Sequence, residues 1–130
     1  MRAQKGLKRI KNSMIKKENI ILHACTKDEW RKAVTQGFFE TPSLKSQGFI
    51  HCSEIDTILR VANSNWNGRK DLILLVIDTN KIVPLVKSEP DPESGTLYPH
   101  IYGPLNTDAV IEIKEFLPNQ SGIFDQSSLV

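Results

Sequence analysis

The feature that most constrains the fold is an uninterrupted apolar run in the second half of the chain. It reads LILLVI from Leu72 to Ile77 and is followed by Asp78. Because polar and apolar residues do not alternate within it, a strand built from it has no face suited to water. The run is also far shorter than the roughly 20 residues that a membrane-spanning helix needs. We therefore expect residues 72–78 to form a central strand covered on both faces, in a chain that crosses no membrane.

Shorter apolar runs on both sides of this segment predict further strands. They cover residues 20–25, 48–52, 82–86, 96–102 and 109–116. The last of them alternates apolar and polar residues, as a half-buried edge strand does. Between the third and fourth runs, residues 89–95 contain two prolines and a glycine, so we expect a surface loop there.

Two helices are predicted early in the chain. Thr26 followed three positions later by Glu29 is a capping box, which predicts a helix over residues 27–36 that ends at Gly37. Ser53 gives a second cap-like signal, and apolar residues then recur at helical spacing. They are Ile55, Ile58, Leu59 and Ala62. His51 is therefore expected where a strand leads into a helix N-terminus, whose free amides attract anionic ligand groups.

The composition is that of one soluble domain. The chain has 130 residues, of which 39% are hydrophobic and 25% charged, and this length suffices for a single core. With helices first and most strands later, we expect an α+β domain with mixed sheets over residues 19–124. Residues 125–130 are expected to be a frayed tail.

The N-terminal segment differs in charge from the rest. Residues 1–18 hold seven of the 17 basic residues and one of the 15 acidic residues, which leaves 10 basic and 14 acidic residues elsewhere. We expect a flexible extension, and nucleic acid is not a favoured partner because the acidic body offers no basic stripe. The extension lacks the apolar region of a secretory signal. Two cysteines imply no disulfide framework, so the expected location is the cytoplasm.

The three histidines share a position in the sequence pattern. His23, His51 and His100 each follow an apolar segment at the expected end of a strand. One such histidine is usually a hydrogen-bonded structural residue, but three together indicate a ligand crevice, because crevices form where strands end. Ser53, Asn63 and Asn106 are candidate partners for the hydroxyl and amide groups of a ligand.

Other chemistries are open at the same positions. Cys52 precedes the expected helix N-terminus, so it could be a thiol nucleophile, although a small buried cysteine is the commoner case. The spacing of histidines and cysteines does not match a zinc site, and no metal is expected. The segment from Tyr98 to Asn106, YPHIYGPLN, is either a rigid turn or a binding loop.

The sequence resembles a bacterial family known as domain of unknown function 952. The resemblance covers residues 20–124 and rests on the blocks ILHACTKDEW, GFIHCSE, VAN and DLILLVID, on the loop at residues 89–95, and above all on YPHIYGPLN. Members of this family resemble the ADP-ribosyltransferase-like fold. The resemblance therefore implies a split mixed β-sheet with two early helices at its edges, and a cleft between two small sheets that holds NAD in enzymes of that superfamily.

The resemblance also implies roles for particular residues. His23 would contact the ribose on the nicotinamide side, and Thr26, the hydroxyl residue that ends the same pattern, is a further candidate for cofactor binding. His51 would stack on nicotinamide, with Ser53 beside it. Glu89 would stabilise the positive charge that develops at the ribose in the transition state. His100 and Tyr102 have no clear counterpart in the transferases and belong to the same expected site.

Three functions follow from these considerations. The first is an enzyme that acts on NAD or a related nucleotide at the ribose C1 position, with His51, Glu89 and His100 as catalytic candidates. The second is a module that binds a small nucleotide-like or phosphorylated ligand in the same cleft without turnover. The third is an interaction domain with structural histidines, in which Trp30 and Trp66 serve as surface anchors.

Overall fold

The structure is a computed structural model that describes residues 18–130. Nearly all of the basic extension expected at residues 1–18 lies outside the described residues. No helix within residues 18–130 is long and apolar enough to cross a membrane.

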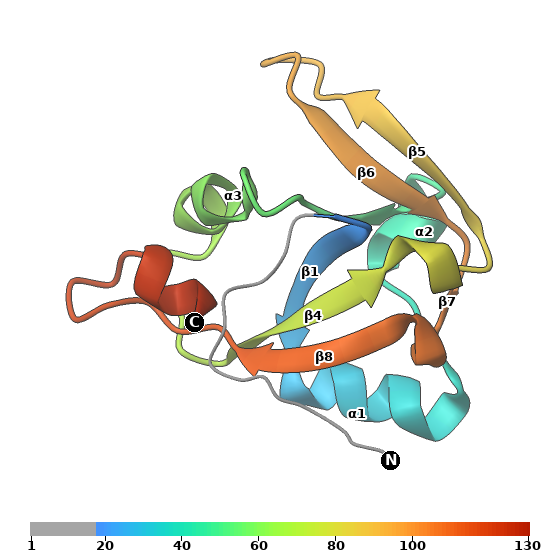
Figure 1. Cartoon of the computed structure of the whole chain (residues 1–130), viewed down its shortest axis with the longest axis horizontal. Coiled ribbons are helices and arrows are strands. Elements are labelled where there is room, and N and C mark those ends of the chain that lie inside the picture. Colours follow the sequence, from blue (N-terminus) through green and yellow to red (C-terminus); the bar gives the residue numbers. More distant parts are fainter. Residues whose placement is uncertain (1–17) are drawn as a thin grey trace.

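The predicted central strand lies in the middle of a three-stranded antiparallel sheet, called the core sheet here (Figure 1). Its strands, in spatial order, are β1 (Ile20–Thr26), β4 (Leu72–Asp78) and β8 (Val110–Glu115). Residues 72–77 of β4 are all buried, as the lack of alternation predicted. Both faces of the sheet are therefore covered.

Each face of the core sheet has its own apolar cluster. One face carries Ile73, Leu75 and Ile77 and packs against helix α1 (Lys27–Gln36) and the smaller sheets. The other face carries Leu74 and packs against helix α3 (Ile58–Asn65) and the C-terminal segment. In Figure 1, α1 lies on one side of the core sheet, and α3 and the C-terminus lie on the other.

Two smaller antiparallel sheets complete the fold. One is the pair β2 (Phe38–Phe39) and β7 (Leu105–Asn106). The other, called the outer sheet here, has the order β3 (Ile50–His51), β6 (Leu97–Tyr102) and β5 (Leu85–Pro90). Figure 1 shows the β5–β6 hairpin projecting beyond the rest of the domain.

One backbone bridge joins the core sheet to the segment that follows the outer sheet. The amide of Leu22 donates to the carbonyl of Ser53 at 2.7 Å, and the amide of Ser53 donates to the carbonyl of Leu22 at 2.8 Å. Leu22 lies on β1, an edge strand of the core sheet, and Ser53 follows β3 by two residues. The bridge therefore holds the end of β3 beside β1.

The first predicted helix is confirmed at both ends, and the second begins later than predicted. Helix α1 spans residues 27–36, and Gly37 follows it as the C-cap. The φ angle of Gly37 is 95°, a conformation that glycine adopts readily because it has no side chain. Helix α3 begins at Ile58, five residues after Ser53, and its N-cap position, Thr57, makes no side-chain cap. Ser53 pairs with β1 instead, so the expectation that His51 precedes a helix N-terminus was wrong.

Short elements fill the connections, and most of them carry weak sequence signals. They are helix α2 (Pro42–Ser46) and the 3-10 helices η2 (Thr79–Lys81), η3 (Thr107–Ala109) and η4 (Gln126–Leu129). The last lies in the segment 125–130, where the sequence predicts a frayed tail. Leu129 is only 2% exposed and packs in the same cluster as Phe116 and Phe124, so this segment is part of the core.

The α+β class is confirmed, but several details of the strand prediction were wrong. Every strand pair in residues 18–130 is antiparallel, so the sheets are not mixed. The strand expected at residues 82–86 begins at Leu85 and pairs with β6. Glu89 and Pro90, assigned to a loop, extend that strand. Pro90 is tolerated because β5 lies at an edge of its sheet.

Candidate functional site

A cleft opens where β1, the segment after β3, α3 and the β5–β6 hairpin meet. It has a volume of about 500 Å³, within the range of small-molecule sites. The residues that line it are Leu22, His23, Ala24, His51, Cys52, Ser53, Ile58, Val61, Asn65, Trp66, Asp91 and Tyr98. Segments far apart in the sequence thus contribute polar groups to one cleft, called the β1–α3 cleft here.

The Leu22–Ser53 bridge explains why two of the histidines meet in this cleft. It brings His51 next to β1, where the Nδ1 atom of His23 lies 2.6 Å from the backbone carbonyl oxygen of His51. A carbonyl oxygen only accepts, so Nδ1 of His23 carries the proton and donates. In the neutral ring, Nε2 of His23 then holds a lone pair, which can accept a hydrogen bond from a ligand hydroxyl.

The third histidine belongs to a polar network on the outer sheet. Nδ1 of His100 lies 2.7 Å from Oε1 of Glu89, and the hydroxyl of Tyr102 donates to the same carboxylate oxygen. The side chains of His100 and Glu89 are 11% and 33% exposed, so the pair is partly shielded from water. We call Glu89, His100 and Tyr102 the Glu89 network.

The Glu89 network adjoins the cleft on the same face of the outer sheet. Tyr98, His100 and Tyr102 alternate along β6 and therefore share a face, and Tyr98 lines the cleft. His51 pairs with His100 across β3 and β6, and the centroids of their rings are 5.4 Å apart. Phe49 stacks on the ring of His100 at 3.9 Å. His51 is thus the residue that lines the cleft and also contacts the network.

Burial and hydrogen bonding shift the pKa values of these groups. Burial lowers the pKa of His51, and the nearby His100 lowers it further, so His51 is neutral at pH 7. Hydrogen bonds from Tyr102 and His100 lower the pKa of Glu89, while the bond to Glu89 raises the pKa of Tyr102. The network is therefore an ionised carboxylate held by a phenol and an imidazole.

Comparisons with known proteins place the chain in a family. The profile of a family described as protein of unknown function (DUF952) matches residues 24–113. The chain belongs to this family. No curated protein matches it. The matched range of this DUF952 domain begins within β1 and ends within β8, so it contains both His51 and the Glu89 network.

Solved structures of a protein from Caulobacter crescentus, CC0527, resemble this DUF952 chain closely. The crystal structure is 26% identical, covers 83% of this chain and 95% of that one, and has a TM-score of 0.74. The solution structure is also 26% identical and covers 86% and 97% of the two chains, with a TM-score of 0.73. The likeness therefore extends over nearly the whole of that protein.

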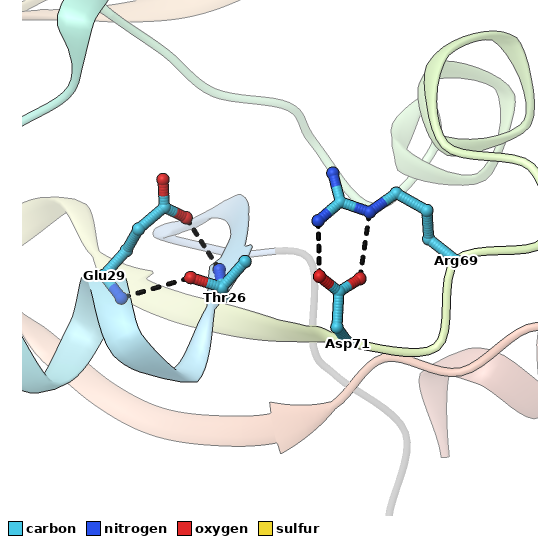
Figure 2. A network of polar contacts seen from close by, with 4 residues as sticks. All are labelled: Thr26, Glu29, Arg69 and Asp71. Atoms are coloured by element: carbon cyan, nitrogen blue, oxygen red, sulfur yellow. Dashed lines mark hydrogen bonds and ion pairs between the residues drawn. The ribbon is translucent and has the colours of Figure 1, made fainter.

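Three of the predicted site residues lie outside both the cleft and the Glu89 network. Thr26 forms the capping box of α1, where its backbone amide donates to Glu29 at 2.7 Å and its hydroxyl accepts from the Glu29 amide at 3.1 Å (Figure 2). The amide of Asn63 is bonded at both ends to the backbone of Phe124, at 2.8 and 2.9 Å. Asn106 holds the backbone of Val83 and Lys81. These side chains have structural partners.

The ion pair drawn beside the capping box in Figure 2 is a separate structural contact. Arg69 donates to the carboxylate of Asp71 through Nε at 2.9 Å and Nη2 at 2.5 Å. Asp71 immediately precedes β4, so the pair lies at the entry to the central strand. Both side chains are largely exposed, and such pairs contribute little to stability.

The thiols are unsuited to nucleophilic chemistry. Cys52 is buried, which raises the pKa of its thiol well above the ordinary range, and burial raises the pKa of Cys25 to about 12. Both are protonated at pH 7, which removes the reactive thiolate. No group of three or more metal-ligating residues within residues 18–130 is arranged to hold a metal ion.

Sequence reasoning missed two polar residues of the cleft, Asn65 and Asp91, and it indicates Trp66 only as a surface anchor and Tyr98 only as part of a candidate binding loop. Asn65 and Trp66 lie at the end of α3, Asp91 lies at the tip of the hairpin, and Tyr98 lies on β6. Asp91 accepts three hydrogen bonds at one carboxylate oxygen, from the amides of Glu93 and Ser94 and from the Ser94 hydroxyl. Only the position of the hairpin relative to α3 reveals them, and no local pattern encodes that position.

The cleft histidine His23 gives a pH-dependent prediction. Burial lowers its pKa from the ordinary value of 6.5, and this outweighs the opposing effects of the bond to His51 and of Glu29. The unfolded chain therefore binds the proton first as the pH falls, and stability decreases below pH 6.5. We expect a His23→Gln variant to lose part of this decrease in urea unfolding measured from about pH 7.5 to about pH 5.5. An unchanged slope would contradict the assignment.

Proposed function

We propose that the β1–α3 cleft binds a nucleotide, with NAD as the first ligand to test. The observation that carries the proposal is the meeting of His23, His51 and Asp91 in one cleft of suitable size. Such a convergence of polar groups in a mainly apolar hollow is the usual form of a small-molecule site. The likeness to the ADP-ribosyltransferase-like fold, and a reducing cytoplasm in which Cys25 and Cys52 remain free thiols, belong to the same proposal.

The chemistry of the lining fits the parts of a nucleotide. Nε2 of His23 and the carboxylate of Asp91 can accept hydrogen bonds from ribose hydroxyls. Trp66 and Tyr98 offer aromatic surface to a base or a nicotinamide ring. Ser53 and Asn65 add a hydroxyl and an amide. His51 is neutral at pH 7, so it suits contact with an uncharged ring.

The binding proposal is tested by calorimetry and thermal unfolding with NAD and ADP-ribose. A ligand that binds only the folded state raises the melting temperature, and at about 100 times its Kd it stabilises by about 2.7 kcal/mol. We expect both compounds to raise the melting temperature, and Asp91→Asn to reduce the shift. Ser88→Ala, an exposed change on β5, is the control. No stabilisation by either compound at millimolar concentration would overturn the proposal.

A second candidate function is hydrolysis or group transfer at the ribose C1 of the bound nucleotide. It is favoured by the contact of His51 with His100, which links the cleft to the ionised Glu89. In hydrolysis of NAD, the C1–N bond breaks, nicotinamide leaves with the bonding electrons, and a water oxygen bonds to C1 and gives its proton to a base. The Nδ1 atom of His100 bonds to Glu89, so Nε2 is the ring nitrogen that would take this proton.

Catalysis is tested by the release of nicotinamide from NAD, followed by chromatography. We expect slow release by the wild-type chain and a loss of about 100-fold or more in kcat for Glu89→Gln, because the neutral amide no longer stabilises positive charge at the ribose or on His100. Glu93→Gln changes an exposed glutamate in the loop of the same hairpin and is the matched control. If the chain binds NAD but releases no nicotinamide, hydrolysis is excluded and the chain is a binding module.

A further inference from the structure

An exposed arginine stands at the rim of the β1–α3 cleft. Arg60 lies on α3 between two residues that line the cleft, Ile58 and Val61. Its Nη2 atom reaches across to the hairpin and donates to the hydroxyl oxygens of Thr96 and Tyr98, at 3.3 Å each. Since Tyr98 also lines the cleft, the guanidinium lies next to the space where a ligand would bind.

The hydrogen-bond partners of Arg60 carry no charge. Both are neutral hydroxyl groups, and Arg60 takes part in none of the ion pairs formed among residues 18–130. The two hydrogen bonds are also long, since a guanidinium bonds to an anionic oxygen at about 2.7–2.9 Å. A phosphate would give Arg60 stronger, charge-assisted bonds than the hydroxyls do.

The lining of the cleft contains no other cation. None of its residues is lysine or arginine, and Asp91 adds a negative charge. The walls therefore suit an uncharged ring and a ribose rather than a phosphate group. A nucleotide would have to place its phosphate at the rim, and Arg60 is the cation that contacts a lining residue there.

We propose that Arg60 is an anion subsite that selects phosphorylated nucleosides over unphosphorylated ones. This inference rests on the proposed nucleotide binding, and it adds the residue that recognises the phosphate: Arg60 would hold the phosphate outside the cleft, with the nucleoside inside. The alternative role is a structural brace that holds the hairpin against α3. The two roles differ in outcome, because a brace affects every ligand and an anion subsite affects only charged ones.

The experiment compares AMP with adenosine by calorimetry, for the wild-type chain and for Arg60→Gln. We expect the wild-type chain to bind AMP more tightly than adenosine, with an affinity for AMP that weakens as salt is added. In Arg60→Gln, the affinity for AMP should fall roughly 10- to 100-fold, while that for adenosine stays within about twofold. Arg31→Gln changes an exposed arginine on α1, away from the cleft, and should leave both affinities unchanged.

The possible results separate this inference from the proposed function. Equal losses for AMP and adenosine in Arg60→Gln would show a brace and overturn the anion subsite. Equal affinity of the wild-type chain for both compounds would also overturn it, while nucleoside binding in the cleft would stand. If the wild-type chain binds neither these compounds nor NAD, the proposed function is wrong and the subsite falls with it.

Discussion

Replacing His51 with alanine is expected to abolish the thermal stabilisation by NAD while the domain remains folded. His51 lines the cleft and contacts His100, so the variant loses the ligand contact and the link to the Glu89 network together. Its own side chain is exposed, and its ring nitrogen bonds to the exposed Gln47 at 2.5 Å. Loss of such a side chain costs about 1 kcal/mol or less of unfolding free energy.

The measurement is the melting temperature of the His51→Ala variant with and without NAD, together with urea unfolding without ligand. Gln47→Ala is the matched control, because it removes the hydrogen-bond partner of His51 and keeps the imidazole in the cleft. We expect Gln47→Ala to retain most of the NAD effect. If the His51→Ala variant is several kcal/mol less stable and its melting temperature still rises with NAD, the role of His51 is structural and the prediction is wrong.

The largest effect on stability is expected for Phe116→Ala. Phe116 is 0% exposed, its ring stacks on Phe124 with centroids 4.7 Å apart, and its amide donates to the carbonyl of Leu72 at 3.0 Å. Truncation of a buried phenylalanine leaves a cavity and costs about 3–5 kcal/mol. Because Phe116 packs between the core sheet and the C-terminal segment, the loss should also loosen that segment.

Urea unfolding at pH 7 measures this change, and Ile111→Ala is the control. Ile111 lies on β8, five residues earlier, and is 49% exposed, so its truncation should cost about 1 kcal/mol or less. Similar small losses for both variants would mean that the C-terminal segment does not pack against the core sheet. Amide hydrogen exchange at Ser128 provides an independent check, because its amide bonds to the carbonyl of Asp125 at 2.8 Å.

The parts of the fold that could be predicted are those encoded by neighbouring residues. The apolar run of β4 predicts burial on both faces, and the structure has it as the central strand. The capping box at Thr26 and the glycine at position 37 fix both ends of α1. In each case the signal and the element lie within the same ten or so residues.

Elements that depend on distant partners were misread. Ser53 has the side chain of a helix cap, but its backbone pairs with Leu22, and α3 begins five residues later. Glu89 precedes a proline and was assigned to a loop, but pairing with β6 extends the strand through Pro90. The last residues look polar and frayed, but Leu129 reaches the core. Tertiary contacts decide all three cases, and single-sequence patterns do not contain them.

The candidate site was predicted in part. The expectation that the three histidines end strands was wrong for two of them, because His23 lies in the middle of β1 and His100 lies within β6; only His51 ends its strand. His23 and His51 nevertheless lie together in the cleft, and the ring of His100 lies beside that of His51. Asn63 and Asn106 were chosen for their side chains alone, and both bond to nearby backbone groups. Asp91 and Tyr98 enter the cleft because the hairpin projects toward α3, which is a property of the assembled fold.

The pairing of Leu22 with Ser53 uses only main-chain atoms, so the side chain of Ser53 is not needed for this contact. Any residue small enough for this nearly inaccessible position could keep both hydrogen bonds. Exchange of the hydroxyl at position 53 for a methyl or a thiol would therefore change the chemistry of the cleft lining and leave the contact between β1 and the segment after β3 in place.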